Sequence, residues 1–402
     1  MTCPFAKFAG KIPFMSMHGH GAGHGYHAEG SSGSLAKALQ VGTARSHRLV
    51  EKSKGVSILL QSTPSGAAAA SEAGFIPFDR INYVQWNIML TCVYASMEAS
   101  LHLCRSHPLL EPIFSDPGLV ASLVRTDVLI NDVEAHLATI QEHQGVSLVD
   151  LANSAREARS FDDTELRLAL QNLVAKSMEH AAQLNANATR SGGRFPSQSH
   201  IDLLTTAQLQ ATLTYVRRLD QLSKNEAGLL LAHAYTRYLG DLSGGQHILK
   251  KVYKRFPTHN STDSQHGFEF YHFTSSSASD RDACSDLKSR FRSAMEEGYA
   301  ACLNSSTAGD PTLALVDEAN LTFELNTNLF EALLPAELRM SANADSESSS
   351  STPLSLSQAT NLGIAKSPVL QFPHLVLIAV STAASVYVTA SLLGIRPLFL
   401  VH

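Results

Sequence analysis

Residues 231–246 read LAHAYTRYLGDLSGGQ and lie inside a longer pattern, residues 227–254, that is otherwise typical of a strong α-helix. Three glycines interrupt this pattern at Gly240, Gly244 and Gly245. Each glycine in a helix interior costs about 1 kcal/mol relative to alanine. This cost indicates that something approaches the helix backbone closely at these positions.

One face of this helix combines bare backbone with two charged side chains. Arg237, Gly240, Asp241 and Gly244 stand at i, i+3, i+4 and i+7, so they share that face. A planar ligand could lie flat against it and receive hydrogen bonds from above. A second interpretation needs no ligand: a neighbouring helix crosses closely at the glycines, and Arg237 pairs with Asp241. Periodicity alone leaves both interpretations open.

Helical periodicity extends over most of the chain, whereas the alternation typical of strands hardly occurs. The sequence therefore predicts an all-α fold. Helices are expected at about residues 34–60, 78–104, 117–143, 161–186, 200–223, 225–255, 280–303 and 310–335, with a loop at 185–199.

The two ends of the chain differ from this helical body, which is expected to form one domain at residues 35–340. Residues 1–34 are rich in Gly and His and are expected to be disordered. Residues 341–374 form a Ser-rich flexible linker. Residues 375–395 carry no charge and are about as long as a bilayer crossing requires. They predict a C-terminal transmembrane anchor that leaves the body in the cytosol, the endoplasmic reticulum being the default membrane. A buried core helix is the alternative.

Composition excludes some classes of function. The 402 residues have a formal net charge of −5, which gives no electrostatic reason to expect a nucleic-acid partner. The five cysteines are scattered and form no CxxC pair, so neither a disulfide framework nor a zinc site is indicated.

The stretch 231–246 closely resembles the signature of the heme oxygenase family. The similarity extends over about residues 35–340, interrupted by two stretches longer than expected, near 60–77 and 141–200. Further segments that resemble the family are 39–47 with Glu51, 93–98, 215–222, 226–230, 248–251, 270–273, 287–295 and 318–330. The resemblance implies a multi-helix bundle in which heme is held between a proximal and a distal helix.

On the proximal side, the resemblance implies that His47 is the ligand to the heme iron. A neutral imidazole is a good donor to heme iron. Glu51 stands one helical turn further on and can accept the other ring N–H, which fixes the tautomer and raises basicity.

On the distal side, the resemblance implies that Asp241 acts without touching iron. Its carboxylate would hold a water and pass protons to dioxygen. Gly240 and Gly244 would let the helix backbone come close to the iron-bound ligand. Three residues match the surrounding hydrogen-bond network of the family: Tyr94, Arg237 and Asn326.

At the edge of the heme, the resemblance implies that Lys288 and Arg292 pair with the propionates, and their i, i+4 spacing puts both on one face. Tyr235, Phe323 and Phe330 are expected to line the pocket, although helical aromatics also serve as plain core. The chain departs from the animal pattern at Gln40 and Ala44, where that pattern has lysines. Arg45 can substitute in part, but the departure leaves the regiospecificity of ring opening undecided.

The resemblance implies an oxidoreductase for which heme b is both substrate and prosthetic group. Dioxygen would be the oxidant, and an NADPH-dependent cytochrome reductase on the same membrane would supply electrons. The products would be biliverdin, ferrous iron and carbon monoxide. Two rivals stay open: a non-catalytic heme sensor or sink, and a tail-anchored interaction protein that binds no heme.

Three short basic or terminal features give further hypotheses. The basic run Lys250, Lys251, Lys254 and Arg255 follows the signature and could dock an acidic reductase. Residues 3–5 read CPF and resemble the short Cys-Pro heme-regulatory motif. Four histidines in the N-terminal segment could bind metal loosely: His18, His20, His24 and His27.

Overall fold

The computed structural model describes residues 34–61, 76–157, 159, 162–184, 197–258, 266–273, 280–305 and 309–339. The chain divides into residues 1–344 and 345–402, and every described residue belongs to the first unit. The predictions for the N-terminal histidines, the CPF motif, the linker and the transmembrane segment at 375–395 therefore lie outside the described residues. Among the helices that are described, none is long and apolar enough to cross a membrane.

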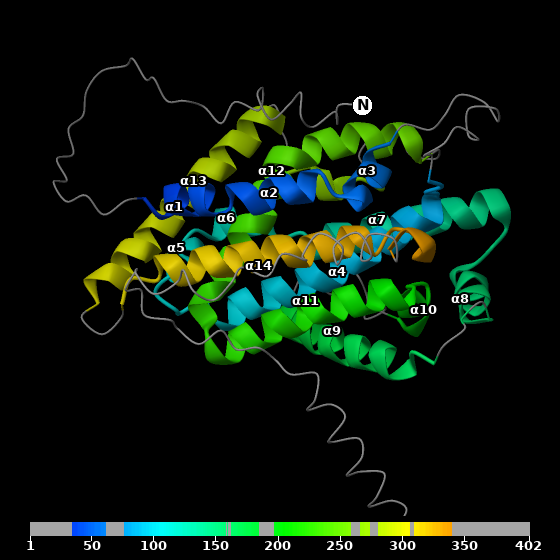
Figure 1. Ribbon diagram of the computed structural model, residues 1–402, viewed down its shortest axis with the longest axis horizontal. Coiled ribbons are helices and arrows are strands. Elements are labelled where there is room, and N and C mark those ends of the chain that lie inside the picture. The colour runs from blue at the N-terminus through cyan, green and yellow to red at the C-terminus, as the bar shows by residue number, and fades with distance from the viewer. Residues whose placement is uncertain are drawn as a thin grey trace, which may run out of the picture. The chain divides into compact units, whose positions relative to one another are not determined.

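The described residues form helices and no strands, which confirms the all-α class (Figure 1). The helices are α1 (Leu35–Gly42), α2 (Ala44–Glu51), α3 (Lys54–Leu60), α4 (Arg80–Leu103), α5 (Glu111–Phe114), α6 (Pro117–Leu123), α7 (Thr126–Gln144), α8 (Leu148–Glu157), α9 (Thr164–Leu184), α10 (Gln198–Asp202), α11 (Thr206–Asn225), η3 (Ala227–Leu229), α12 (Leu230–Arg255), η4 (Glu269–Tyr271), α13 (Asp280–Asn304) and α14 (Thr312–Glu331).

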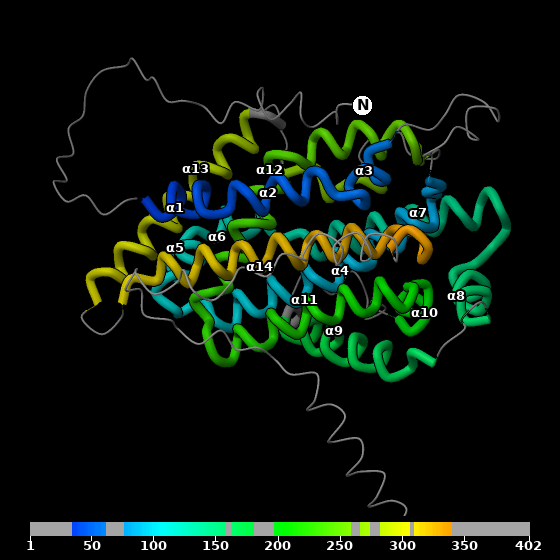
Figure 2. Tube along the Cα trace, viewed as in Figure 1, coloured from blue at the N-terminus to red at the C-terminus, as the bar shows by residue number. Residues whose placement is uncertain are grey.

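Helix α4 lies at the centre of the bundle and is buried along most of its length. It begins at a reciprocal cap in which the Asp79 side chain accepts from the Asn82 backbone and the Asn82 side chain accepts from the Asp79 backbone. Helices α7, α9, α11 and α12 pack around it. Helix α14 contacts α1, α2, α3, α11 and α12, so the N-terminal helices lie along it (Figure 2).

Three of the predicted helices are divided in the structure, and the one at 200–223 divides between α10 and α11. The stretch 34–60 forms three helices, with breaks at Thr43, which leaves the helical conformation, and at Lys52 and Ser53. Ser53 then caps α3 by accepting from the Val56 N–H. The stretch 117–143 divides before Thr126, because the Glu98 carboxylate captures the backbone N–H of Arg125 at 2.6 Å. Local periodicity predicted continuous helices, and it contains no information about a tertiary hydrogen bond such as the one between Arg125 and Glu98.

The stretch 141–200 adds α8 and α9 to the bundle, and a buried arginine fixes them. Arg167 is 2% exposed and donates to both oxygens of Asp163, at 2.6 and 2.7 Å. It also donates to the Leu204 carbonyl at 2.8 Å, which ties α9 to the start of α11. The guanidinium is thus fully paired, as a buried charge requires.

A buried histidine predicts how the stability of the fold depends on pH. Arg80 donates to Nδ1 of His136 at 2.9 Å, so Nε2 carries the proton and donates to the Gly267 carbonyl. Burial, with a smaller effect of Arg80, lowers the pKa of His136 from 6.5 to about 3. Between pH 6.5 and about 5, the unfolded chain binds a proton that the folded chain does not. We expect the free energy of unfolding to fall by about 2 kcal/mol over this range.

Urea denaturation at several pH values measures this effect. His136→Asn should flatten the fall, whereas the same change at His143, which is exposed near the end of α7, should leave it unchanged. An equally steep fall in His136→Asn would contradict the assignment.

Candidate functional site

Four of the predicted distal residues come together from three helices. Asn326 on α14 accepts a hydrogen bond from the Arg237 guanidinium at 2.8 Å. Arg237 also donates through Nε to the Tyr94 hydroxyl at 3.3 Å, and its guanidinium lies 4.9 Å from the Tyr94 ring centroid. Tyr94 in turn donates to Oδ2 of Asp241. The result is a chain of donors and acceptors, which we call the distal network, running from α14 through α12 and α4 to Asp241.

Asp241 is suited to hold a proton. Burial raises the pKa of its carboxyl group well above the usual range. Oδ2 is the oxygen that accepts from Tyr94, and Oδ1 has no hydrogen-bond partner within the described part of the chain. A carboxyl group with one anchored oxygen and a raised pKa can donate a proton near neutral pH.

The two glycines beside Asp241 face open space. A Cβ built at Gly240 or Gly244 would meet no other part of the described structure within 4 Å. Gly240 is also exposed, although the residues before it on α12 are mostly buried. The interpretation of a close helix–helix crossing at these two glycines is therefore wrong. Gly245 is different, because its Cβ would lie 3.4 Å from the Tyr271 ring.

The open space at Gly240 leads to a stability prediction. Gly240→Ala should raise the free energy of unfolding of the heme-free chain by about 0.5–1 kcal/mol, since alanine favours the helix and the methyl group meets no obstacle. At Gly298 the added Cβ would lie 2.7 Å from the Leu109 carbonyl oxygen, so Gly298→Ala should destabilise the chain instead. Urea denaturation of both variants makes the comparison. A destabilised Gly240→Ala would show that this face is packed.

His47 lies on α2 with its ring accessible. Its side chain is 53% exposed, and Nδ1 lies 3.5 Å from the Glu51 carboxylate one turn later. No described residue provides a hydrogen-bond partner for Nε2, so this nitrogen is available as a ligand. The Phe323 ring packs edge-on against the His47 ring at a centroid distance of 5.5 Å. The pair with Glu51 has the spacing that the sequence predicted.

One turn of α14 joins the two sides of the candidate site. Phe323 contacts His47, and Asn326, three residues later, accepts from Arg237. Residues at this spacing are neighbours on one helix face, about 5–6 Å apart at Cβ. His47 and the distal network are therefore held to the same short segment of α14.

The predicted heme-edge residues lie on α13 and the facing part of α12. Lys288 and Arg292 are half-buried, and burial lowers the pKa of Lys288, with a smaller effect from Arg292. Tyr235 on α12 is close enough to Arg292 for the guanidinium to offset part of the rise that burial causes in the tyrosine pKa. Helix α13 also holds the start of α1, because Glu296 accepts from the backbone N–H groups of Leu35 at 3.0 Å and Ala36 at 2.9 Å.

Two expectations need correction. Phe330 stacks on Trp86 at a centroid distance of 4.6 Å and so belongs to a core contact. Arg255 is not a free member of the basic run, because its guanidinium donates to the carbonyls of Ile58 and Phe78. Lys250 and Lys254 are exposed and Lys251 is half-exposed.

Sequence reasoning missed a buried ion network beside the site. His233 is fully buried, and its Nε2 lies 2.9 Å from the Glu318 carboxylate, which also accepts from Arg218. Burial alone would raise the pKa of Glu318, but the hydrogen bonds from His233 and Arg218 outweigh it and lower the pKa to about 2. The network ties α11, α12 and α14 together. Both His233 and Glu318 lie in segments singled out by their pattern, but nothing in that pattern paired them.

Comparison with known proteins finds similarity over the part of the chain that contains α11 to α14. Residues 202–332 match the family model described as heme oxygenase. The chain is 39% identical over 132 residues to a heme oxygenase of Guillardia theta, covering 33% of this chain and 48% of that protein. It is 38% identical over 124 residues to heme oxygenase 1 of Bos taurus, covering 31% of this chain and 38% of that protein. The chain thus spans about half, or less, of the length of these curated relatives.

A solved structure was also found: heme oxygenase-1 from the cyanobacterium Synechocystis sp. PCC6803 in complex with heme. It is 23% identical, with a TM-score of 0.44, covering 80% of this chain and 100% of that chain.

The described residues define an all-helical protein with a polar network beside a bare helix face. Over residues 202–332, the chain is similar to the heme oxygenase family. The matched region runs from α11 to α14 and includes Arg237, Asp241 and Asn326. His47 and Tyr94 precede it, so the structure is what relates these two residues to the rest of the site.

Proposed function

We propose that this chain is a heme oxygenase that opens heme b to biliverdin, ferrous iron and carbon monoxide. It would use dioxygen and electrons passed from NADPH by a reductase. The observation that carries the proposal is the position of the distal network. The network ends at Asp241 beside the open backbone of Gly240 and Gly244, while the same turn of α14 contacts the accessible ring of His47.

The residues present fit heme on several counts. His47 offers an imidazole nitrogen that has no described partner, and Glu51 is placed to hold the other nitrogen. Gly240 and Gly244 leave room against α12 for a flat group. Lys288 and Arg292 would pair with its carboxylates. When bound, heme supplies the iron that activates dioxygen and the ring that is oxidised.

In this proposal the chain's own contribution is positioning and proton supply. Tyr94 fixes Oδ2 of Asp241, and Arg237 fixes Tyr94, so the carboxyl group has one orientation. The raised pKa of Asp241 keeps a proton available, and the free Oδ1 can hold a water that carries it. Gly240 and Gly244 would present backbone rather than side chains to the face of a bound heme.

The test is a reaction of the purified full-length chain with heme, an NADPH-dependent cytochrome reductase and NADPH. We expect the Soret band to disappear, with one biliverdin isomer and carbon monoxide formed. Formation of a heme complex whose Soret band persists would instead identify a heme sensor or sink. Failure to bind heme at all would point to an interaction protein.

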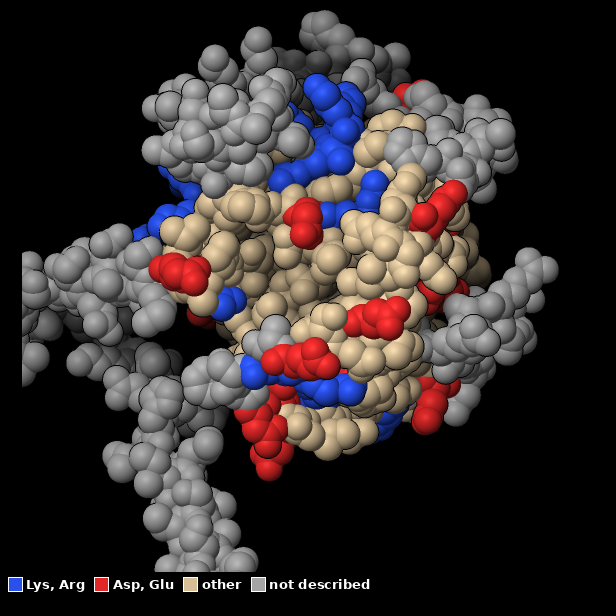
Figure 3. All heavy atoms as spheres, turned by 90° about the vertical axis from the view of Figure 1, so that its right-hand side faces the viewer, with Lys and Arg blue, Asp and Glu red and all other residues tan. Residues whose placement is uncertain are grey.

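The reductase would dock where basic side chains are free. Lysine and arginine side chains gather towards the top of the face seen in Figure 3, the side on which α12 lies in Figure 1. Exchange of Lys250 and Lys254 for glutamate should slow reductase-driven turnover but leave dithionite reduction of bound heme unchanged. Equal turnover at low salt would remove this surface from the proposal.

The membrane proposal rests on sequence. Residues 375–395 would anchor the chain in the endoplasmic reticulum membrane with the catalytic domain facing the cytosol. A fluorescent protein fused ahead of residues 341–402 should co-localise with that membrane and resist carbonate extraction. A soluble fusion would contradict the anchor.

A further inference from the structure

A cavity lies between α4, α9 and α11, and none of the candidate heme-site residues lines it. Its volume is about 300 Å³, at the lower end of the range for small-molecule sites. Ser96, Ala99, Ser100 and Leu103 form its α4 wall at i, i+3, i+4 and i+7. Tyr94 is two residues before Ser96, so its side chain leaves α4 roughly 200° away around the axis. The cavity is therefore on the other side of α4 from the distal network.

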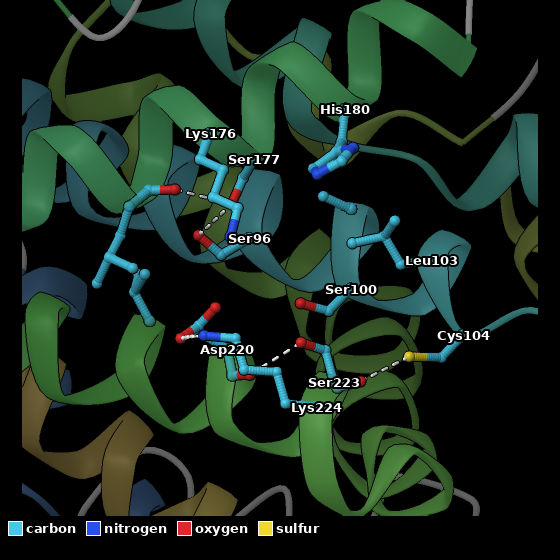
Figure 4. A pocket seen from close by; sticks show the side chains of 13 residues that line it. Ser96, Ser100, Leu103, Cys104, Lys176, Ser177, His180, Asp220, Ser223 and Lys224 are labelled. Atoms are coloured by element: carbon cyan, nitrogen blue, oxygen red, sulfur yellow. Dashed lines mark hydrogen bonds and ion pairs between the residues drawn. The ribbon is translucent and has the colours of Figure 1, made fainter.

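The cavity contains a hydroxyl group that has no hydrogen-bond partner among the described residues. Ser100 is only 7% exposed and points into the cavity (Figure 4), yet no described residue hydrogen-bonds to its Oγ. The neighbouring hydroxyls are paired: Ser177 donates to the Leu173 carbonyl at 3.0 Å, and Ser223 donates to the Asp220 carbonyl at 2.8 Å. The Ser100 hydroxyl is accessible from the cavity, so it can form a hydrogen bond with a ligand bound there.

The charge of the lining favours an anion. Asp220 is neutralised by Lys224, whose Nζ lies 2.5 Å from its carboxylate. Lys176 and His180 stand one turn apart on α9 and also line the cavity. Neither has an ion-pair partner among the residues that the structure describes. The lining thus has one uncompensated positive charge, together with an imidazole and the free hydroxyl.

We propose that this cavity binds a small organic anion, a carboxylate or phosphate monoester with a short apolar group. Lys176, His180 and Ser100 would hold the anionic oxygens. The apolar group would lie against the apolar part of the lining, which consists of Ala99, Leu103, Leu173 and Val216. Helix α9, which supplies Lys176 and His180, lies in the stretch that is longer than the family pattern leads one to expect. The site does not depend on heme.

Calorimetric titration of the full-length, heme-free chain tests the proposal. The probes are hexanoate and butyl phosphate at millimolar concentrations, with hexylammonium as the cationic control. We expect saturable binding of at least one of the two anions and none of hexylammonium. The tighter of the two anions identifies the head group that the site prefers. Failure of both anions to saturate, or equal binding of hexylammonium, would overturn the proposal.

Two variants and a control locate the binding. Lys176→Met and Ser100→Val should each weaken anion binding roughly tenfold, since each removes one strong hydrogen bond. Lys54→Met, an exposed lysine at the start of α3, should have no effect. Lys176 is exposed, so its replacement keeps the test valid even if Ser100→Val folds poorly. Unchanged binding in Lys176→Met would rule out this cavity.

Discussion

His47→Ala is expected to lower the rate of biliverdin formation by at least about 100-fold while leaving the fold intact. The loss follows because no other described residue offers an imidazole beside Phe323. The fold should be spared because α2 contributes no buried side chain and His47 is 53% exposed, so the stability cost should be under about 0.5 kcal/mol. Absorbance of the heme complex and pigment release are the two measurements.

Added imidazole gives this prediction a specific rescue. A free imidazole can occupy the space that the shortened side chain leaves, so part of the turnover should return in His47→Ala. The same addition should not raise turnover in the wild-type chain. His143→Ala, an exposed histidine near the end of α7, is the matched control and should behave as wild type. Normal turnover of His47→Ala without imidazole would remove His47 from its role.

Asp241→Ala is the second variant with a large expected effect. It should bind heme to within about threefold of wild type, yet form biliverdin about 100- to 1000-fold more slowly, because the anchored proton donor is lost. Activated oxygen should then be diverted, and the variant should oxidise an added phenol with hydrogen peroxide faster than wild type does. Pigment formation at the normal rate would show that Asp241 supplies no proton.

The Asp241 carboxyl group also predicts how stability depends on pH. Its contribution falls as pH rises, which is opposite to the effect of His136. Because burial raises its pKa, folded Asp241 binds a proton more tightly than the unfolded chain does. Its contribution is therefore present at low pH and is lost as pH rises above the unfolded value of about 3.9. Asp241→Asn should make the heme-free chain more stable near neutral pH and reduce this dependence. A less stable Asp241→Asn would mean that the carboxylate is well solvated or paired.

The α-helical class and the long helix through residues 231–246 could be predicted from periodicity because the period of apolar residues persists across the glycines. The breaks at Thr43 and before Thr126 could not. The second break follows from the hydrogen bond between Arg125 and Glu98, which is 27 residues away in sequence. Helix propensity contains no information about such partners.

The candidate site likewise has a part that the sequence could predict and a part that it could not. That Arg237, Gly240 and Asp241 share a face follows from spacing alone. That Tyr94 reaches Asp241 across 147 residues was implied only by the resemblance. The ligand-free interpretation paired Arg237 with Asp241, whereas the structure directs Arg237 to Tyr94 and Asn326. Residues on one face of a helix can have partners on two other helices, and only the packing decides which.

Helix α2 has no buried side chains, and this has a consequence for how heme would enter and the pigment would leave. A helix with little apolar anchoring opens at a small fraction of the global unfolding free energy. Helix α2 is therefore expected to open locally more often than α12 or α14. Substrate loading and pigment release would then share one route, and amide hydrogens on α2 should exchange with deuterium much faster than those in the middle of α12.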